Sequence, residues 1–226
     1  MNRLAFVALS ILASACGDSP TAPSKVPPAL PAPTVPAEPG PAPAPTPVPV
    51  PAGPVMAPPP IGVSAEVWRV AFAPNSRLYR PDAVHLDVAS FGSNIQDIFA
   101  EMAAAAAVQS KTTFDLIPGG IGADFAVSLK PGLICGGFGK TAACTTPTFG
   151  GDGRVMGGTM EFTSIAALQD RPLVLHEMFW TLGLTGPSPK SGLLSMTPWP
   201  QPRLSDEEHL MVLGRYDYPL LAVYSQ

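Results

Sequence analysis

The pair His176-Glu177 lies in the apolar stretch LVLHEMFWTLGL, and it is followed by Gly183 and later by Met196. An imidazole is a common ligand of transition metals, and a neighbouring carboxylate can act as general base towards a metal-bound water. A His-Glu pair on an apolar helix can also arise by chance. A buried histidine is more often a hydrogen-bonded core residue than a metal ligand. The pair therefore indicates either a metal site or a polar core contact.

The pattern around this pair resembles the signature of the metzincin zinc peptidases, and among them the matrixin-like secreted enzymes. That signature is HExxHxxGxxH, followed by a turn that contains methionine. Its first two histidines project from one face of a helix, and the glycine lets the chain turn so that the third histidine reaches the metal. The resemblance covers about residues 65–220. It implies that His176 is the first ligand position, Glu177 the general base and Met196 the methionine of the turn.

Two of the three ligand positions depart from the signature. The second is Trp180 and the third is Gly186, and neither side chain can coordinate zinc. A catalytic zinc normally has three protein ligands. Replacements would have to come from elsewhere, and no spacing places these candidates near His176: His85, His209, Asp124, Asp152 and Glu161. We therefore expect a vestigial ligand in His176, a vestigial base in Glu177 and no cofactor, with zinc present only if unexpected ligands complete the site.

Signals for helix ends place His176 and Glu177 on a predicted helix. Asp170 can cap a helix with Pro172 in its first turn, and this helix is expected to run to about Leu182 and to stop at Gly183. Ser93 with Gln96 and Ser205 with Glu208 have the spacing of a capping box, and they predict two more helices, over residues 93–109 and 205–215.

Strand-like segments occupy residues 67–72, 83–88, 114–117, 124–129 and 155–162, and residues 131–153 read as a glycine-rich loop. This order predicts an α/β fold with a mixed sheet. The resemblance implies more: a mostly parallel, five-stranded twisted sheet packed on two helices, a third helix after the methionine turn, and 155–162 as the edge strand of a substrate cleft.

The N-terminus is typical of an exported lipoprotein. Residues 4–12 form a short apolar run after Arg3, and Ala13-Ser14-Ala15-Cys16 resembles a bacterial lipobox. Residues 1–16 are thus expected to be a signal peptide with Cys16 as the lipidated residue, although an ordinary secretory signal would leave Cys16 free. The expected location is the bacterial cell envelope, with a lipid anchor in a membrane.

Proline dominates the next segment, since 18 of the 30 prolines fall within residues 17–60. Because proline fixes φ and lacks an amide donor, we expect a disordered, extended linker there. Residues 61–226 are then the degenerate metzincin-like domain.

The cysteine pair and the net charge limit the classes of function that the sequence allows. Cys135 and Cys144 form an even pair that most simply makes a disulfide in an exported protein, and a zinc knuckle would need a second pair. The net charge of −4 argues against binding nucleic acid.

The sequence thus predicts a membrane-anchored pseudo-metallopeptidase that binds peptides or a protein partner. One alternative is an active zinc endopeptidase with atypical ligands, and another is a structural envelope lipoprotein.

Overall fold

A computed structural model describes residues 53–72, 75–117, 121–136, 139–196 and 200–224, all within one compact unit. The expected signal peptide, Cys16 and most of the proline-rich segment lie outside the described residues. Within the described ranges, no helix combines the length and the apolar composition that crossing a membrane requires.

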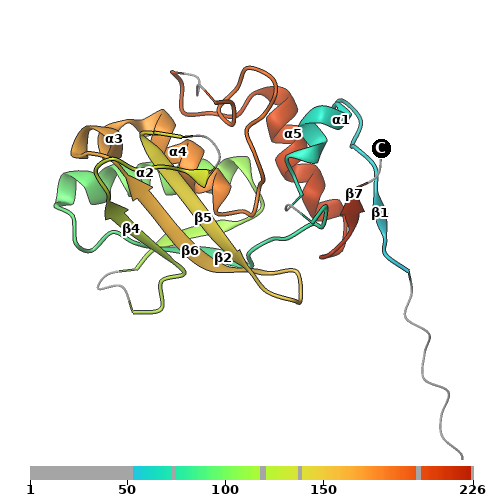
Figure 1. Cartoon of the computed structure of the whole chain (residues 1–226), viewed down its shortest axis with the longest axis horizontal. Helices are drawn as coiled ribbons and strands as arrows, with labels where there is room; N and C mark the ends of the chain where they lie inside the picture. Colours follow the sequence, from blue (N-terminus) through green and yellow to red (C-terminus); the bar gives the residue numbers. More distant parts are fainter. Residues whose placement is uncertain (1–52, 73–74, 118–120, 137–138, 197–199, 225–226) are drawn as a thin grey trace, which may run out of the picture. The chain divides into compact units, whose positions relative to one another are not determined.

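A five-stranded sheet forms the centre of this unit (Figure 1). Its spatial order is β3-β2-β4-β6-β5, in which β5 alone runs antiparallel to its neighbour. The strands are β2 (Ala83–Asp87), β3 (Thr113–Leu116), β4 (Phe125–Leu129), β5 (Ala143–Phe149) and β6 (Val155–Phe162). The predicted α/β class, with a mixed and mostly parallel five-stranded sheet, is confirmed.

Three longer helices accompany the sheet, as predicted: α2 (Ser93–Gln109), α4 (Arg171–Trp180) and α5 (Asp206–Gly214). Helix α2 packs on α4 and β3, and α4 packs on β5. Figure 1 shows α2 and α4 behind the sheet. The core lies between these helices and the sheet, where alternate residues of β2, Val84 and Leu86, are fully buried.

Shorter elements complete the unit. They are β1 (Met56–Ala57), α1 (Ala65–Arg69), α3 (Ile165–Gln169), a 3₁₀ turn (Arg215–Asp217) and β7 (Val223–Tyr224), which pairs with β1 in parallel. Ala57 is fully buried and its carbonyl accepts a hydrogen bond from Trp68 Nε1 at 2.8 Å. The folded unit therefore begins before residue 61, inside the segment expected to be linker.

Two strand predictions were wrong. Residues 67–72 do not form a strand: Val67 and Trp68 belong to helix α1, and their side chains are buried. The prediction failed because a short apolar run fits a buried helical turn as well as a strand. The missing fifth strand is β5, which lies within the region predicted as a glycine-rich loop.

The edge strand was also assigned wrongly, since β6 lies between β4 and β5, and the two edge strands are β3 and β5. The two glycines of β6 explain its place. A Cβ at Gly157 would collide with the carbonyl of Asp124 beside β4, and a Cβ at Gly158 with the carbonyl of Thr146 in β5. Glycine here permits close approach from both sides.

Helix caps were predicted with mixed success. Asp170 caps α4 by accepting from the Leu173 amide, and Ser205 with Glu208 forms the expected capping box of α5. The box expected at Ser93 is wrong: Gly92 is the N-cap of α2, and Gln96 donates to the Phe91 carbonyl instead.

Candidate functional site

Helix α4 presents His176, Glu177 and Trp180 to one region of the domain. The helix starts at Arg171 under the Asp170 cap, so His176 and Trp180 lie one turn apart on the same face. His176 is 9% exposed and Glu177 is 3% exposed.

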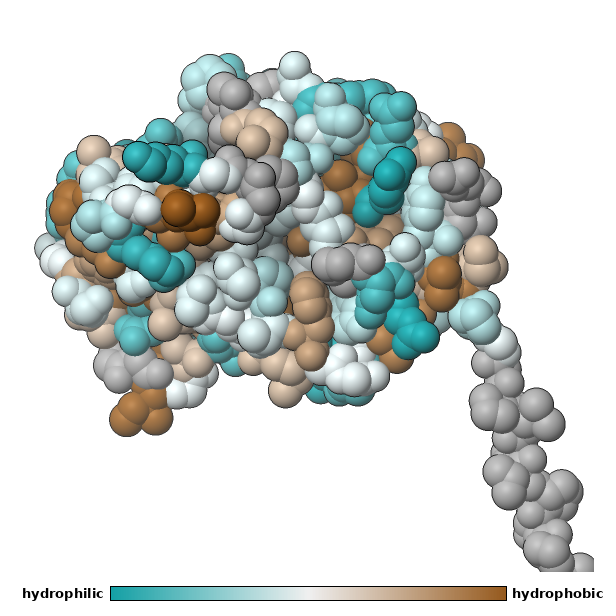
Figure 2. Space-filling view, in the orientation of Figure 1, coloured by the Kyte–Doolittle hydropathy of each residue, from teal (hydrophilic) through white to brown (hydrophobic). Residues whose placement is uncertain are grey.

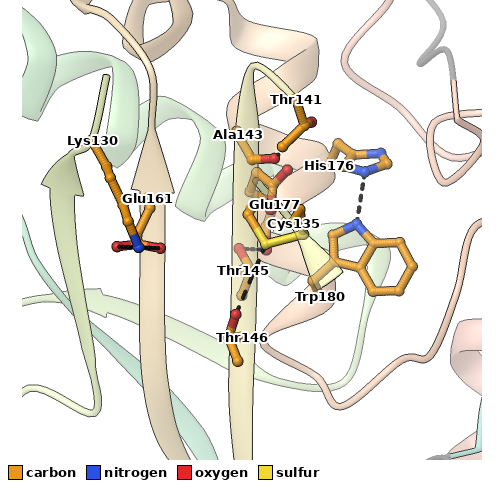
Figure 3. Close-up of a disulfide and its surroundings, with 11 residues drawn as sticks. Lys130, Cys135, Thr141, Ala143, Thr145, Thr146, Glu161, His176, Glu177 and Trp180 are labelled. Atoms are coloured by element: carbon orange, nitrogen blue, oxygen red, sulfur yellow. Dashed lines mark hydrogen bonds and ion pairs between the residues drawn. A yellow bond between two sulfur atoms is a disulfide. The ribbon is translucent and has the colours of Figure 1, made fainter. Parts of the chain in front are cut away.

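Both ring nitrogens of His176 are hydrogen bonded, and Figure 3 shows the bond to Trp180. Trp180 Nε1 donates to Nε2 at 2.7 Å, and Nδ1 lies 2.5 Å from the Leu193 carbonyl oxygen. An indole N–H can only donate, so Nε2 is an acceptor and the proton lies on Nδ1. Desolvation by burial lowers the pKa of His176, although the bond to Leu193 opposes that shift. His176 is therefore a neutral imidazole with no free lone pair.

These residues do not fit a zinc ion. The lone pair of Nε2 is taken by the residue at the second ligand position, and Gly186 has no side chain to offer. Within the described part of the chain, no group of three or more His, Cys, Asp or Glu side chains could hold a metal. The candidate replacements are engaged elsewhere: His85 with Asp124, Asp152 with Arg154 and Glu161 with Lys130, while His209 lies on α5.

Glu177 is a buried carboxyl group beside this pair. Its Oε2 has no hydrogen-bond partner, and desolvation raises the pKa of Glu177 to about 7, with hydrogen bonding from Thr145 lowering it only in part. The group thus changes charge near neutral pH.

A cleft of about 310 Å³ lies along these residues. Its walls are α4, the edge strand β5 and residues 184–196, and Glu177 is the only Asp, Glu, Lys or Arg among the described residues that line it. Figure 2 shows a largely pale surface, neither strongly hydrophilic nor strongly hydrophobic, over the middle of the molecule. The lining residues include Ala143, Pro147, Phe149, Leu173, Leu184 and Met196. The cleft is therefore suited to uncharged, apolar groups.

The disulfide lies at the same cleft. Cys135 and Cys144 are joined, as predicted, and both line it (Figure 3). Cys144 belongs to β5, so the bond ties the preceding loop to the edge strand.

The main-chain groups on the free edge of β5 are only partly available to a binding partner. Thr163 N–H donates to the Ala142 carbonyl, and hydrogen-bonded pairs alternate along an antiparallel ladder. Ala143, Thr145 and Pro147 therefore direct their main-chain groups away from β6. The Ala143 carbonyl already accepts from the Thr141 hydroxyl, the Thr145 main-chain amide donates to the Glu177 carboxyl group, and Pro147 has no amide hydrogen. Three of the six main-chain positions that an added strand would use are therefore occupied or lack a donor.

The segment that contains Met196, the expected methionine of the turn, borders the cleft. Met196 is 64% exposed at the rim of the cleft, whereas Leu193 and Leu194 are fully buried. The Leu193 carbonyl, which contacts His176, is a main-chain group and gave no signal in the sequence.

No known family model matches this chain, and no curated protein matches it in sequence.

Proposed function

We propose that this chain is a lipid-anchored, extracytoplasmic pseudo-metallopeptidase: a metzincin-like domain that has lost its zinc site and binds a peptide or protein partner in the cleft between α4 and β5. The observation that carries this proposal is the hydrogen bond from Trp180 Nε1 to His176 Nε2.

The inactive state follows from that bond. In a working site of this kind, Nε2 or Nδ1 of each histidine gives its lone pair to the metal. Here Trp180, at the second ligand position, offers a hydrogen-bond donor where zinc would need a second lone pair. Its indole N–H also occupies the lone pair of His176, the residue at the first ligand position. Glu177 then has no metal-bound water to deprotonate, so we expect no peptide hydrolysis.

Binding remains possible because the cleft does not depend on a metal. It is lined mainly by apolar groups, and the side chains of Phe149 and Met196 are exposed at its rim. The cleft is lined mainly by apolar groups, and half of the main-chain positions at Ala143, Thr145 and Pro147 on the free edge of β5 are occupied or lack a donor. The partner is therefore recognised chiefly through apolar side chains that enter the cleft. The expected ligand is an uncharged segment of a peptide or protein.

The location outside the cytoplasm is supported by the sequence of residues 1–16 and by the bond between Cys135 and Cys144, because structural disulfides persist in oxidising compartments.

Peptides selected from a random displayed library against the purified protein provide the test. We expect Met196→Asp to weaken binding of a selected peptide by about tenfold or more, since it places a charge at the apolar rim. Met156→Asp is the matched control: Met156 is 61% exposed against 64% for Met196, and it does not line the cleft.

Three outcomes would count against the proposal. Equal effects of the two substitutions would place binding elsewhere. Cleavage of the peptides, abolished by Glu177→Gln, would favour the active peptidase. A failure to select any peptide would favour a structural lipoprotein.

A further inference from the structure

Glu208 on α5 is a buried carboxylate with more partners than a helix cap requires. It is 1% exposed. Its oxygens accept from Ser205 N at 2.9 Å, which is the capping-box contact, and also from Ser205 Oγ at 2.9 Å. They also accept from the amides of Leu193 at 3.0 Å and Leu194 at 2.8 Å, in the segment that borders the cleft.

Leu193 connects this carboxylate to His176. Its amide donates to Glu208 and its carbonyl accepts from His176 Nδ1, so one residue bridges α5 and α4. Gly192 next to it leaves room for the carboxylate, because a Cβ at that position would overlap the Glu208 oxygens.

We propose that Glu208 is a positioning residue for the cleft: it holds the Leu193 carbonyl against His176 Nδ1, and this leaves Nε2 free to accept from Trp180. The chain of contacts runs from Glu208 through Leu193 and His176 to Trp180. The inference concerns the cleft of the proposed function, and it rests on that function only for its relevance to binding. Its test uses the free protein, so it succeeds or fails independently of any partner.

The adjacent carboxylate shows that this role is specific to position 208. Glu207 accepts from Ser64 N at 2.8 Å and from Lys190 Nζ, and it makes no contact with Leu193 among the described residues. Glu207→Gln is therefore one control. Ser205→Ala is the second, because it weakens the helix cap but leaves the bonds from Leu193 and Leu194 to Glu208.

The experiment follows the Trp180 indole N–H in the ¹H–¹⁵N spectrum of the full chain, with its signal assigned from a Trp180→Phe variant. Glu208→Gln places an amide donor where backbone amides donate now. We expect the indole proton to shift upfield and its hydrogen exchange to accelerate about tenfold or more, as one lost hydrogen bond implies. Gly192→Ala, which displaces the carboxylate without changing it, should shift the same signal in the same direction.

Both controls should leave the indole signal in place, even though Ser205→Ala lowers stability. An unchanged indole signal in folded Glu208→Gln would overturn the proposal. So would an equal shift in Ser205→Ala, since that would reduce Glu208 to a helix cap. If Glu208→Gln does not fold, Gly192→Ala decides by the same criteria.

Discussion

The Trp180 indole N–H donates to His176 Nε2 across 2.7 Å, one helical turn away on α4. The nitrogen that would face a metal in a zinc peptidase is thus satisfied by a residue of its own helix. The tryptophan supplies the hydrogen-bond donor that this buried imidazole nitrogen needs.

This bond should be measurable as a coupling energy. Trp180→Phe keeps an aromatic ring but leaves His176 Nε2 buried without a donor, so we expect a loss of stability of about 1–3 kcal/mol in urea unfolding. In a chain that already carries His176→Phe, the same substitution should cost clearly less. Equal costs in the two backgrounds would mean that the indole contributes packing alone.

Stability should fall with rising pH because of Glu177. Its pKa is about 7 in the folded protein against an ordinary 4.5, so between these values the folded state binds more protons than the unfolded state. The free energy of unfolding then declines from pH 4.5 to 7 and levels off above, by about 3 kcal/mol at most.

Glu177→Gln should remove this decline. His176 acts in the opposite sense, because its lowered pKa makes stability rise as pH increases towards 6.5, so the difference between wild type and variant is the quantity to measure. Parallel pH profiles for the two proteins would contradict the assignment.

The disulfide between Cys135 and Cys144 should stabilise the domain. The paired substitution Cys135→Ala with Cys144→Ala is expected to lower the free energy of unfolding by about 2–3 kcal/mol in the chain-entropy model. Addition of a reductant should destabilise wild type by a similar amount and leave the variant unchanged. Two titratable thiols in the folded, unreduced protein would refute the pairing.

Lipidation at Cys16 is a separate prediction. Cys16→Ser should move the protein from the membrane fraction to the soluble fraction of the expressing bacterium, since it removes the proposed attachment point of the lipid. Unaltered membrane retention and unaltered detergent partitioning would show that another element holds the protein there.

The sequence predicted the elements with strong local signals. Asp170 with Pro172 marked the start of α4, and the Ser205–Glu208 spacing marked α5, because capping chemistry is local. It failed for β5, whose threonines and proline suit an exposed edge that only the neighbouring β6 defines.

The residues of the candidate site were likewise predictable only in part. His176, Glu177 and Trp180 were identifiable from their spacing on one helix. Their partners were not, because the Leu193 carbonyl comes from a segment 17 residues further along the chain. Glu208 was recognised only as a cap, and its bonds to Leu193 and Leu194 arise from the packing of α5 against that segment.

The central claim is that Trp180 occupies the place of a metal on His176, and zinc content tests it most directly. Trp180→His restores an i, i+4 pair, and Gly186→His adds a third imidazole. Apart from its chain neighbours, no described heavy atom lies within 4 Å of a Cβ built at Gly186. Its φ of +75° strains any residue that carries a Cβ, although histidine is found in this conformation more often than most residues.

Elemental analysis after dialysis should find far less than one zinc per chain in wild type. The double variant should bind close to one, and more than either single variant. A folded double variant without zinc would count against the metzincin-like geometry. One zinc per wild-type chain, lost on His176→Ala, would contradict the account outright.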